Sequence, residues 1–263
     1  MEKKLALSEI KKKRLGLVLS GGGVRGMAHI GLLKAMEECG LEAQVIAGSS
    51  IGALVGALYA QGHTITDMLK FFKDTPLFRY NFFALGKAGL LDTERYSAIF
   101  KAYFPEDSFE NLKKELFVVT TNLEMGEEEI IHQGELILPL LASAALPPVF
   151  SPVKYKGMLH ADGGIMNNFP TEPLVNRAEF VIGSNVSIVA PAQKKDLTNS
   201  FQLTGRTTGL MIYAINRKKM KSCDILIEPK ALERIGILDR RGIEKAYALG
   251  YEAALGAFGK SNV

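Results

Sequence analysis

A strand, a glycine-containing turn and a helix occur twice in succession near the start of the chain, and this order constrains the fold most. Residues 15–20 are short, apolar and followed by glycines, which is typical of a buried strand. Apolar residues then recur every third position over residues 27–36, as on one face of a helix that Gly40 can end. A second short strand, residues 44–47, repeats the order. Such units predict parallel strand pairing with a right-handed crossover.

The remaining sequence continues the alternation of strands and helices. We expect strands over 116–121, 180–186 and 224–227, and helices near 136–145, 205–220 and 241–258. No internal repeat or Pro/Gly/Ser-rich linker marks a boundary, and 263 residues is an ordinary length for one α/β domain. The sequence therefore predicts an α/β fold with a central sheet covered by helices, formed by residues 1–263 as a single domain.

The charge pattern argues against nucleic acid as a partner. The net charge is only +4, and no basic segment alternates with aromatic residues as in a single-strand binder. Basic residues cluster at 11–14 and 217–221. These clusters are either a solvated surface or a surface with weak attraction to anionic lipid headgroups, where each basic group adds roughly 1 kcal/mol.

The cysteines and the apolar segments of the sequence indicate in which cellular compartment the protein is expected. Cys39 and Cys223 lie far apart without metal-ligand spacing, which indicates neither a disulfide framework nor a cysteine metal site and favours a reducing compartment. No segment approaches the roughly 18 apolar residues of a membrane span. Residues 15–19 are too short for the core of a signal peptide. We expect a cytoplasmic protein whose contact with a membrane surface, if any, is peripheral.

The first motif with chemical content is Gly-x-Ser-x-Gly at residues 48–52, between the second strand and an apolar helix. A nucleophilic serine in this context occupies a sharp turn, and Gly48 and Gly52 let the backbone pass without Cβ clashes. The helix that follows directs its N-terminal N–H groups toward the serine and favours developing negative charge. Ser50 is therefore the candidate nucleophile, since Ser49 lacks the flanking glycine spacing.

The second motif is the glycine-rich segment 21–26, which directly follows the first strand. Its members of interest are Gly21, Gly22, Gly23, Arg25 and Gly26. Consecutive glycines can point successive N–H groups into one concavity that binds an anion. Acyl transfer requires such donors for the oxyanion that forms at the attacked carbonyl. Arg25 is expected either to brace the loop or to meet a headgroup phosphate.

The same segment also matches the G-x-G-x-x-G pattern of nucleotide-binding loops. That pattern expects an acidic residue about 20 positions later, at the end of the second strand. Here the second strand leads into residues 47–50, which contain no carboxylate, and no Gly-Lys-Ser/Thr follows as in a P-loop. A nucleotide-binding protein using residues 21–26 is kept as the alternative hypothesis.

The third motif, Asp162-Gly163-Gly164, supplies a candidate base. Asp-Gly-Gly alone is a common turn, but the serine needs a base, and a Ser-Asp-His hydrolase places its histidine last in chain order. The latest histidine, His160, precedes Asp162; His29, His63 and His132 are interpreted as ordinary polar residues. A carboxylate accepts a serine proton when its pKa and geometry are suitable. Asp162 is therefore the leading candidate, and His160 merits a test.

The segment 71–104 holds ten of the 22 Phe and Tyr residues of the chain. One interpretation is a helical excursion packed on the core. The other is a lid or an acyl-chain wall, because amphiphilic substrates need an apolar surface beside the reacting ester. The sequence leaves both interpretations open.

Together and in this order, the three motifs resemble those of the patatin-like phospholipase family, which is related to patatin and the cytosolic phospholipases A2. Residues 28–35 and 142–147 also resemble bacterial members, and the similarity covers roughly residues 14–190. The resemblance implies a three-layer α/β/α fold with a mainly parallel sheet. It also implies a serine–aspartate dyad instead of a triad, and neither a metal nor a cofactor.

Carried onto this sequence, the resemblance makes Ser50 the nucleophile, Asp162 the base, and the amides of Gly22 and Gly23 the oxyanion hole. The implied reaction is hydrolysis of a lipid or other acyl ester through an acyl-enzyme. Phospholipid, neutral lipid and thioester substrates stay open, as does the oligomeric state. No accessory domain is expected. A non-catalytic lipid-binding protein of the same fold is a third hypothesis, against which the intact Ser50 and Asp162 argue.

Overall fold

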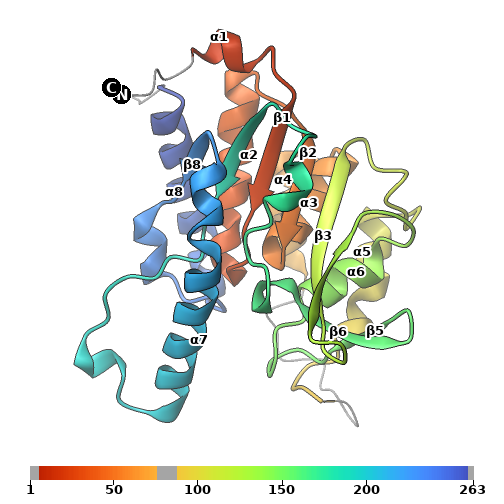
Figure 1. Cartoon of the computed structure of the whole chain (residues 1–263), viewed down its shortest axis with the longest axis vertical. Coiled ribbons are helices and arrows are strands. Elements are labelled where there is room, and N and C mark those ends of the chain that lie inside the picture. The colour runs from red at the N-terminus through yellow and green to blue at the C-terminus, as the bar shows by residue number, and fades with distance from the viewer. Residues whose placement is uncertain (1–5, 76–87, 260–263) are drawn as a thin grey trace.

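The computed structural model describes residues 6–75 and 88–259 (Figure 1). Its helices are α1 (Leu7–Ile10), α2 (Met27–Cys39), α3 (Ile51–Gln61), α4 (Ile65–Asp74), α5 (Ser97–Tyr103), α6 (Ile137–Ser143), α7 (Ser200–Asn216) and α8 (Ile243–Ala257). Its strands are β1 (Leu15–Leu19), β2 (Ala43–Ser49), β3 (Glu115–Asn122), β4 (Glu127–Ile131), β5 (Val153–Tyr155), β6 (Met158–Asp162), β7 (Phe180–Ser184) and β8 (Ile225–Ile227). Within the described residues the strands form one sheet in the order β5-β6-β3-β2-β1-β7-β8, with β4 paired to β3.

The sheet is mainly parallel, which confirms the α/β fold class predicted from the sequence. β3, β2, β1, β7 and β8 are parallel neighbours in this order. β4, β5 and β6 add antiparallel pairs on the β3 side. None of these three strands is among those expected from the sequence. β4 lacks the alternation of apolar and polar residues that predicts a strand, because three of its five residues are glutamates and it is mostly solvent-facing. β5 has only three residues, too few to show such a pattern.

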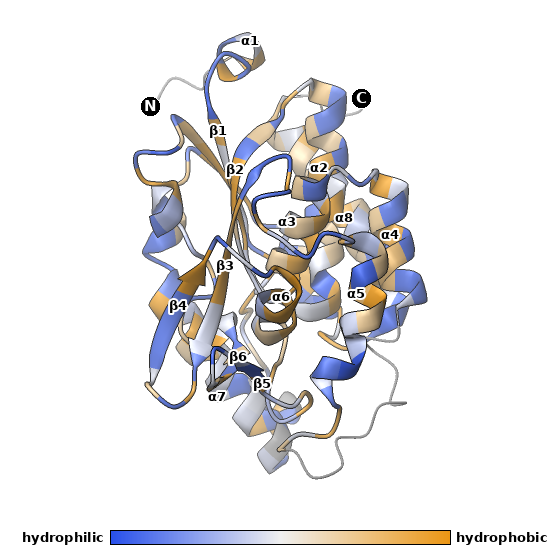
Figure 2. Cartoon of the chain, turned by 90° about the vertical axis from the view of Figure 1, so that its right-hand side faces the viewer, coloured by the Kyte–Doolittle hydropathy of each residue, from blue (hydrophilic) through white to orange (hydrophobic). Residues whose placement is uncertain are grey.

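Side chains of the central strands alternate between two apolar layers, as the two-residue period of a strand requires. In β1, Leu17 and Leu19 join the larger layer and Val18 joins the smaller one. The larger layer includes residues of α2, α3, α4, α6 and α8. The smaller layer includes Phe169, Leu174 and Met220 as well as strand residues, and Tyr213 of α7 packs against it. Helices therefore cover the two faces unequally, and Figure 2 shows most of them on one side of the sheet.

Local sequence explains where the helices beside β1 and β2 begin and end. Gly40 ends α2 with φ 64°, as the sequence predicts, and Gly62 ends α3 with φ 92°. α4 begins at a capping box, in which the Thr64 side chain accepts a hydrogen bond from the Asp67 amide and the Asp67 carboxylate accepts one from the Thr64 amide. Ser50 lies at the other end of α3, where β2 leads into the helix.

The helix expected near residues 205–220 is observed over Ser200–Asn216, so its start and end both differ from the prediction. Asn199 caps the helix, and its side chain accepts a hydrogen bond from the Gln202 amide. This cap outweighs the weak helix propensity of Gly205. A separate short 3-10 turn follows over Lys219–Ser222.

The aromatic segment 71–104 packs on the core wherever it is described. Phe71, Phe72, Tyr96, Phe100 and Phe104 are buried. The Phe71 ring contacts Phe72 and Phe100 edge-to-face, with centroids 4.9 Å and 5.4 Å apart. These contacts favour the core-packing interpretation for residues 71–75 and 88–104. The aromatic residues at 78–83, part of the lid hypothesis, lie outside the described residues.

Candidate active site

Ser50 occupies the turn between β2 and α3 with φ 53° and ψ −127°, a conformation that residues with a side chain seldom adopt. The two flanking glycines permit this turn because the backbone around it is crowded. A Cβ on Gly48 would lie 2.6 Å from the amide nitrogen of Ala53, and one on Gly52 would lie 2.2 Å from the carbonyl oxygen of Leu19. The turn thus places Ser50 at the N-terminus of α3, beside the end of β1.

We expect Gly52→Ala to destabilise the fold by about 2–3 kcal/mol or more, because the added methyl group meets the β1 backbone rather than a flexible side chain. Urea unfolding measures this change. Gly205→Ala is the matched control: a Cβ there meets nothing within 4 Å, so the same substitution in α7 should stabilise by about 0.5–1 kcal/mol. Equal effects at the two positions would contradict the steric explanation.

Asp162, the last residue of β6, lies beside Ser50. The Ser50 hydroxyl donates a hydrogen bond of 2.6 Å to Asp162 Oδ2. The other carboxylate oxygen, Oδ1, accepts a 2.7 Å bond from the Gly164 amide. In the sheet, β3 separates β2 from β6, and Thr121 of β3 donates to the Asp162 backbone carbonyl at 2.9 Å. The two side chains therefore meet across β3 although they are 112 residues apart in sequence.

The environment of Asp162 changes its basicity. Burial raises the pKa of this carboxyl from 3.8 to about 6, while the hydrogen bonds from Ser50 and the Gly164 amide lower it. Asp162 is therefore mostly ionised near neutral pH, yet it holds a proton more strongly than an ordinary aspartate. A general base requires this combination of charge state and proton affinity.

The glycine loop begins beside Ser50, since a Cβ on Gly21 would lie 3.0 Å from the Ser50 Cβ. Gly22 and Gly23 both have positive φ values, 154° and 58°. The amides on either side are anchored: Gly21 donates to Asn168 Oδ1 at 3.1 Å, and Val24 donates to a backbone carbonyl at 2.8 Å. No described residue accepts a hydrogen bond from the amide of Gly22 or Gly23. Free donors on a fixed loop are what an oxyanion hole requires.

Arg25 and Gly26 hold this loop in place. The Arg25 guanidinium donates to the backbone carbonyls of Ile235 at 2.7 Å, Glu233 at 3.2 Å and Ile188 at 3.3 Å. Gly26 lies so close to α3 that a Cβ would stand 2.5 Å from an isoleucine side chain. Of the two roles considered for Arg25, these contacts favour bracing over contact with a headgroup.

Comparison with known protein families places this chain. The family model for patatin-like phospholipases matches residues 17–175, more than half of the sequence. The chain belongs to the patatin-like phospholipase family. The matched range contains the glycine loop, Ser50 and Asp162, so the resemblance drawn from the motifs is confirmed at the level of the family.

Relatives of this patatin-like chain include much longer proteins. A patatin-like phospholipase domain-containing protein of Caenorhabditis elegans is 32% identical over 200 residues, covering 71% of this chain and 14% of that protein. Lysophospholipase NTE1 of Cryptococcus neoformans is 31% identical over 201 residues, covering 72% and 12%. An uncharacterized NTE family protein of Mycobacterium tuberculosis is 33% identical over 163 residues, covering 61% and 45%. The chain thus matches less than half the length of each.

A solved structure shares the fold. VipD from Legionella pneumophila superposes with a TM-score of 0.66, over 94% of this chain and 67% of the VipD chain. The two sequences are 16% identical. This similarity supports the fold of the patatin-like chain and nothing beyond it.

Two residues to which the sequence assigns no role, Asn168 and Ser143, support the candidate site of this member of the patatin-like phospholipase family. Asn168 accepts from Gly21 through Oδ1 and donates to Ser187 Oγ at 2.9 Å, so it ties the glycine loop to the segment after Asp162. Ser143, on α6, accepts a 2.9 Å hydrogen bond from the Ser50 amide. Ser143 lies within residues 142–147 and Asn168 lies four residues after Asp162-Gly163-Gly164, but neither has a spacing that reveals its contact.

His29 and His160 are buried and bond elsewhere. His29 Nε2 donates a 2.9 Å hydrogen bond to the Ser20 carbonyl, and His29 Nδ1 forms a 2.8 Å hydrogen bond with Ser184 Oγ. Burial lowers the pKa of His29 to about 4. His160, two residues before Asp162, hydrogen-bonds Thr120 Oγ1 through Nδ1 at 3.0 Å, and burial lowers its pKa. These contacts give neither histidine a direct bond to the candidate nucleophile.

The other two histidines also make structural contacts. His63 donates to the carbonyl of Tyr103 at 2.9 Å, and His132 stacks on Phe117 with ring centroids 5.0 Å apart. Their partners agree with the interpretation of both as ordinary polar residues.

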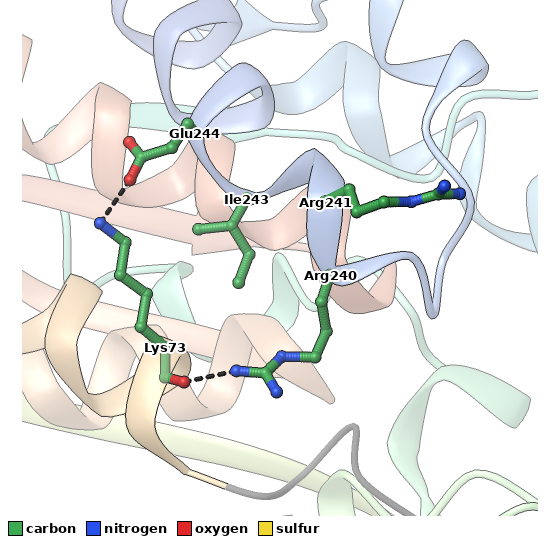
Figure 3. A pocket seen from close by; sticks show the side chains of 5 residues that line it. All are labelled: Lys73, Arg240, Arg241, Ile243 and Glu244. Carbon is green, nitrogen blue, oxygen red and sulfur yellow. Dashed lines mark hydrogen bonds and ion pairs between the residues drawn. The ribbon is translucent and has the colours of Figure 1, made fainter.

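A pocket of about 320 Å³ lies between the end of α4 and the start of α8 (Figure 3). Lys73 forms an ion pair with Glu244 there, and Arg240 donates to the Lys73 carbonyl. None of the five lining residues belongs to the Ser50–Asp162 pair or the glycine loop. Within the described part of the chain, no cluster of three or more His, Cys, Asp or Glu side chains could hold a metal ion.

Proposed function

We propose that this chain is a serine acyl hydrolase that cleaves lipid acyl esters, with Ser50 as nucleophile and Asp162 as base. The observation that carries the proposal is the 2.6 Å hydrogen bond from the Ser50 hydroxyl to the Asp162 carboxylate, whose pKa burial raises to about 6. Membership of the patatin-like phospholipase family supports a lipid acyl ester as the substrate class.

In the proposed acylation step, Asp162 accepts the Ser50 proton while the Ser50 oxygen attacks the substrate carbonyl carbon. Negative charge then develops on the carbonyl oxygen. The free amides of Gly22 and Gly23 and the N-terminal end of α3 are positioned to stabilise that charge. When the tetrahedral intermediate collapses, the leaving alcohol takes the proton from Asp162 and the acyl group stays on Ser50.

Water completes the proposed cycle. Asp162 accepts a proton from the water molecule as it attacks the acyl-enzyme carbonyl, and the same amides stabilise the second oxyanion. The fatty acid leaves as Ser50 regains its proton. One carboxylate therefore serves as base twice, and no histidine takes part.

The alternative nucleotide-binding function fits the geometry less well. A dinucleotide site needs a carboxylate at the end of the second strand for the ribose hydroxyls. β2 ends at Ser49, and Ser50 follows with its hydroxyl on Asp162. A non-catalytic lipid-binding protein would have no need of the unusual Ser50 backbone conformation, whose strain costs on the order of 1–3 kcal/mol.

No helix of the described residues is long and apolar enough to cross a membrane. We propose that the protein reaches lipid by contact with a membrane surface. A cytoplasmic location, inferred from the cysteine pattern, remains a prediction.

The proposed function is tested by trapping the acyl-enzyme. Incubation with a slowly hydrolysed acyl ester followed by mass spectrometry should show one acyl group on the peptide that contains Ser50, and fatty acid should accumulate in the medium. Acylation at another residue would assign a different nucleophile. Folded protein that neither acylates nor releases fatty acid, but is stabilised by nucleotide, would favour the alternative function.

The pH dependence follows from the pKa of Asp162. Because the ionised carboxylate is the active form, kcat/KM for a soluble short-chain ester should rise with pH and level off above an apparent pKa near 6. A plateau extending down to about pH 4, where an ordinary aspartate titrates, would show that the raised pKa does not control the reaction.

A further inference from the structure

Helix α7 carries an exposed apolar face. Leu203, Leu210, Met211 and Ile215 are 52%, 42%, 66% and 50% exposed. At 3.6 residues per turn these four side chains fall within an arc of about 140° around the helix axis, which they share with the exposed Thr204 and Thr207. α7 contains one charged residue, Arg206, which donates to the Ala190 carbonyl at 2.7 Å. The exposed face is therefore uncharged over a helix of 17 residues, about 25 Å long.

The opposite side of α7 attaches the helix beside the candidate site. Tyr213 packs against the smaller apolar layer, and Asn216 Oδ1 accepts a 3.1 Å hydrogen bond from the Phe169 amide. Phe169 follows Asn168, which holds the glycine loop through Gly21. Figure 1 shows α7 with its C-terminal end beside the sheet and its N-terminal half projecting beyond the strands. The apolar face thus lies near the end of the sheet where Ser50 sits.

Basic residues flank this helix on both sides. Residues 194–221 contain seven lysines and arginines and one aspartate, a net charge of +6, whereas the whole chain carries +4. Lys194 and Lys195 precede α7, and Lys218 and Lys221 follow it; all four are exposed. Lys219 differs, because it pairs with Glu172 at 2.5 Å. The positive charge of the protein is therefore concentrated around an apolar, protruding helix.

We propose that α7 and its flanking lysines form the surface by which the protein docks on an anionic lipid bilayer. An interfacial helix inserts apolar side chains at the boundary between headgroups and acyl chains, while nearby lysines contact anionic headgroups. The exposed apolar side chains of α7 suit the acyl-chain side of this boundary, and the lysines at both ends of the helix suit the headgroups. The inference rests on the proposed lipid hydrolase function and extends it. Docking through α7 would bring the bilayer toward the end of the sheet at which β2 leads into Ser50.

Vesicle flotation tests the charge requirement. The full chain carrying Ser50→Ala, which prevents turnover of the vesicles, should bind phosphatidylcholine vesicles containing about one third phosphatidylglycerol at least tenfold more strongly than pure phosphatidylcholine vesicles. Neutralising Lys218 and Lys221 to Gln should weaken binding about fivefold for each lysine. Neutralising the exposed Lys101 and Lys245 to Gln is the control and should leave binding unchanged. Equal losses for both pairs would overturn the assignment of α7.

The apolar requirement is tested in the same assay. Met211→Ser with Ile215→Ser should weaken binding to the anionic vesicles at least tenfold without changing thermal stability, because both side chains face solvent. Met125→Ser with Val175→Ser, at positions 61% and 62% exposed, should leave binding unchanged. Unaltered binding of the α7 variant would overturn the proposal.

The outcomes separate docking from catalysis and from self-association. Vesicle binding by α7 in a protein that never hydrolyses a soluble ester would support docking and remove the proposed function. Hydrolysis of a soluble ester without vesicle binding would support the proposed function and overturn the docking proposal. If light scattering shows a dimer that Met211→Ser with Ile215→Ser converts to a monomer, α7 is an interface between two copies and the proposal is wrong.

Discussion

Ser50→Ala should lower kcat for ester hydrolysis by about 10⁴-fold or more and abolish labelling by a fluorophosphonate probe. The substitution removes the hydroxyl that donates a hydrogen bond to the Asp162 carboxylate. The fold should be retained, because Ser50 is partly exposed at the start of α3. Steady-state kinetics, probe labelling and circular dichroism of the purified variant measure these three effects.

Ser49→Ala is the matched control for this experiment. Ser49 is the adjacent residue, it is fully buried, and its hydroxyl has no hydrogen-bond partner among the described residues. Its loss should leave kcat and labelling near the native values, and stability unchanged or slightly increased, since an unpaired buried hydroxyl is removed. If Ser49→Ala rather than Ser50→Ala eliminated labelling, the assignment of the nucleophile would be wrong.

Asp162→Asn should lower kcat about 10³-fold while stabilising the protein above pH 6. Burial raises the pKa of Asp162 to about 6, so between about pH 4 and pH 6 the native state binds more protons than the unfolded chain. Native stability therefore falls as pH rises through this window and stays lowered above it. The asparagine variant carries no buried charge, and its free energy of unfolding should exceed that of the native protein by about 1–3 kcal/mol above pH 6.

Urea unfolding at several pH values measures this difference, which should vanish below about pH 4. Asp239→Asn provides a contrast, because hydrogen bonds and charge attraction from Arg241 lower the pKa of Asp239. Its stabilising contribution is present above the ordinary aspartate pKa and is lost as pH falls, so that variant should be less stable than the native protein at neutral pH. Equal signs for the two variants would contradict the role of burial at Asp162.

The sequence predicts the first half of the fold well because each element there has a local signal. The strand expected over 15–20 is observed as Leu15–Leu19, and the helix that Gly40 ends runs over Met27–Cys39. The antiparallel strands were not predicted. β6 carries Asp162, yet its sequence, Met-Leu-His-Ala-Asp, shows no clean alternation, and it is a strand only because β3 and β5 pair with it.

The candidate site was only partly predictable, for a similar reason. Glycine spacing points to Ser50 and to the loop 21–26, because crowded backbone leaves no room for a side chain and so requires glycine at those positions. Asn168 and Ser143 act through contacts with residues far away in the chain, and a polar side chain at one position gives no sign of such a partner. The exposed face of α7 was likewise hidden, since an apolar residue in a helix normally indicates burial. The single domain over residues 1–263 remains a prediction.

The position of β3 between β2 and β6 has a consequence for how the protein becomes competent. Ser50 follows β2 and Asp162 ends β6, so the pair forms only after β3 has joined both strands. Pairings this distant in sequence form slowly compared with a local strand–helix–strand unit. During synthesis, the segment with Ser50 emerges and can fold before Asp162 has been added to the chain. Under the proposed mechanism, the protein therefore becomes competent for hydrolysis late in folding.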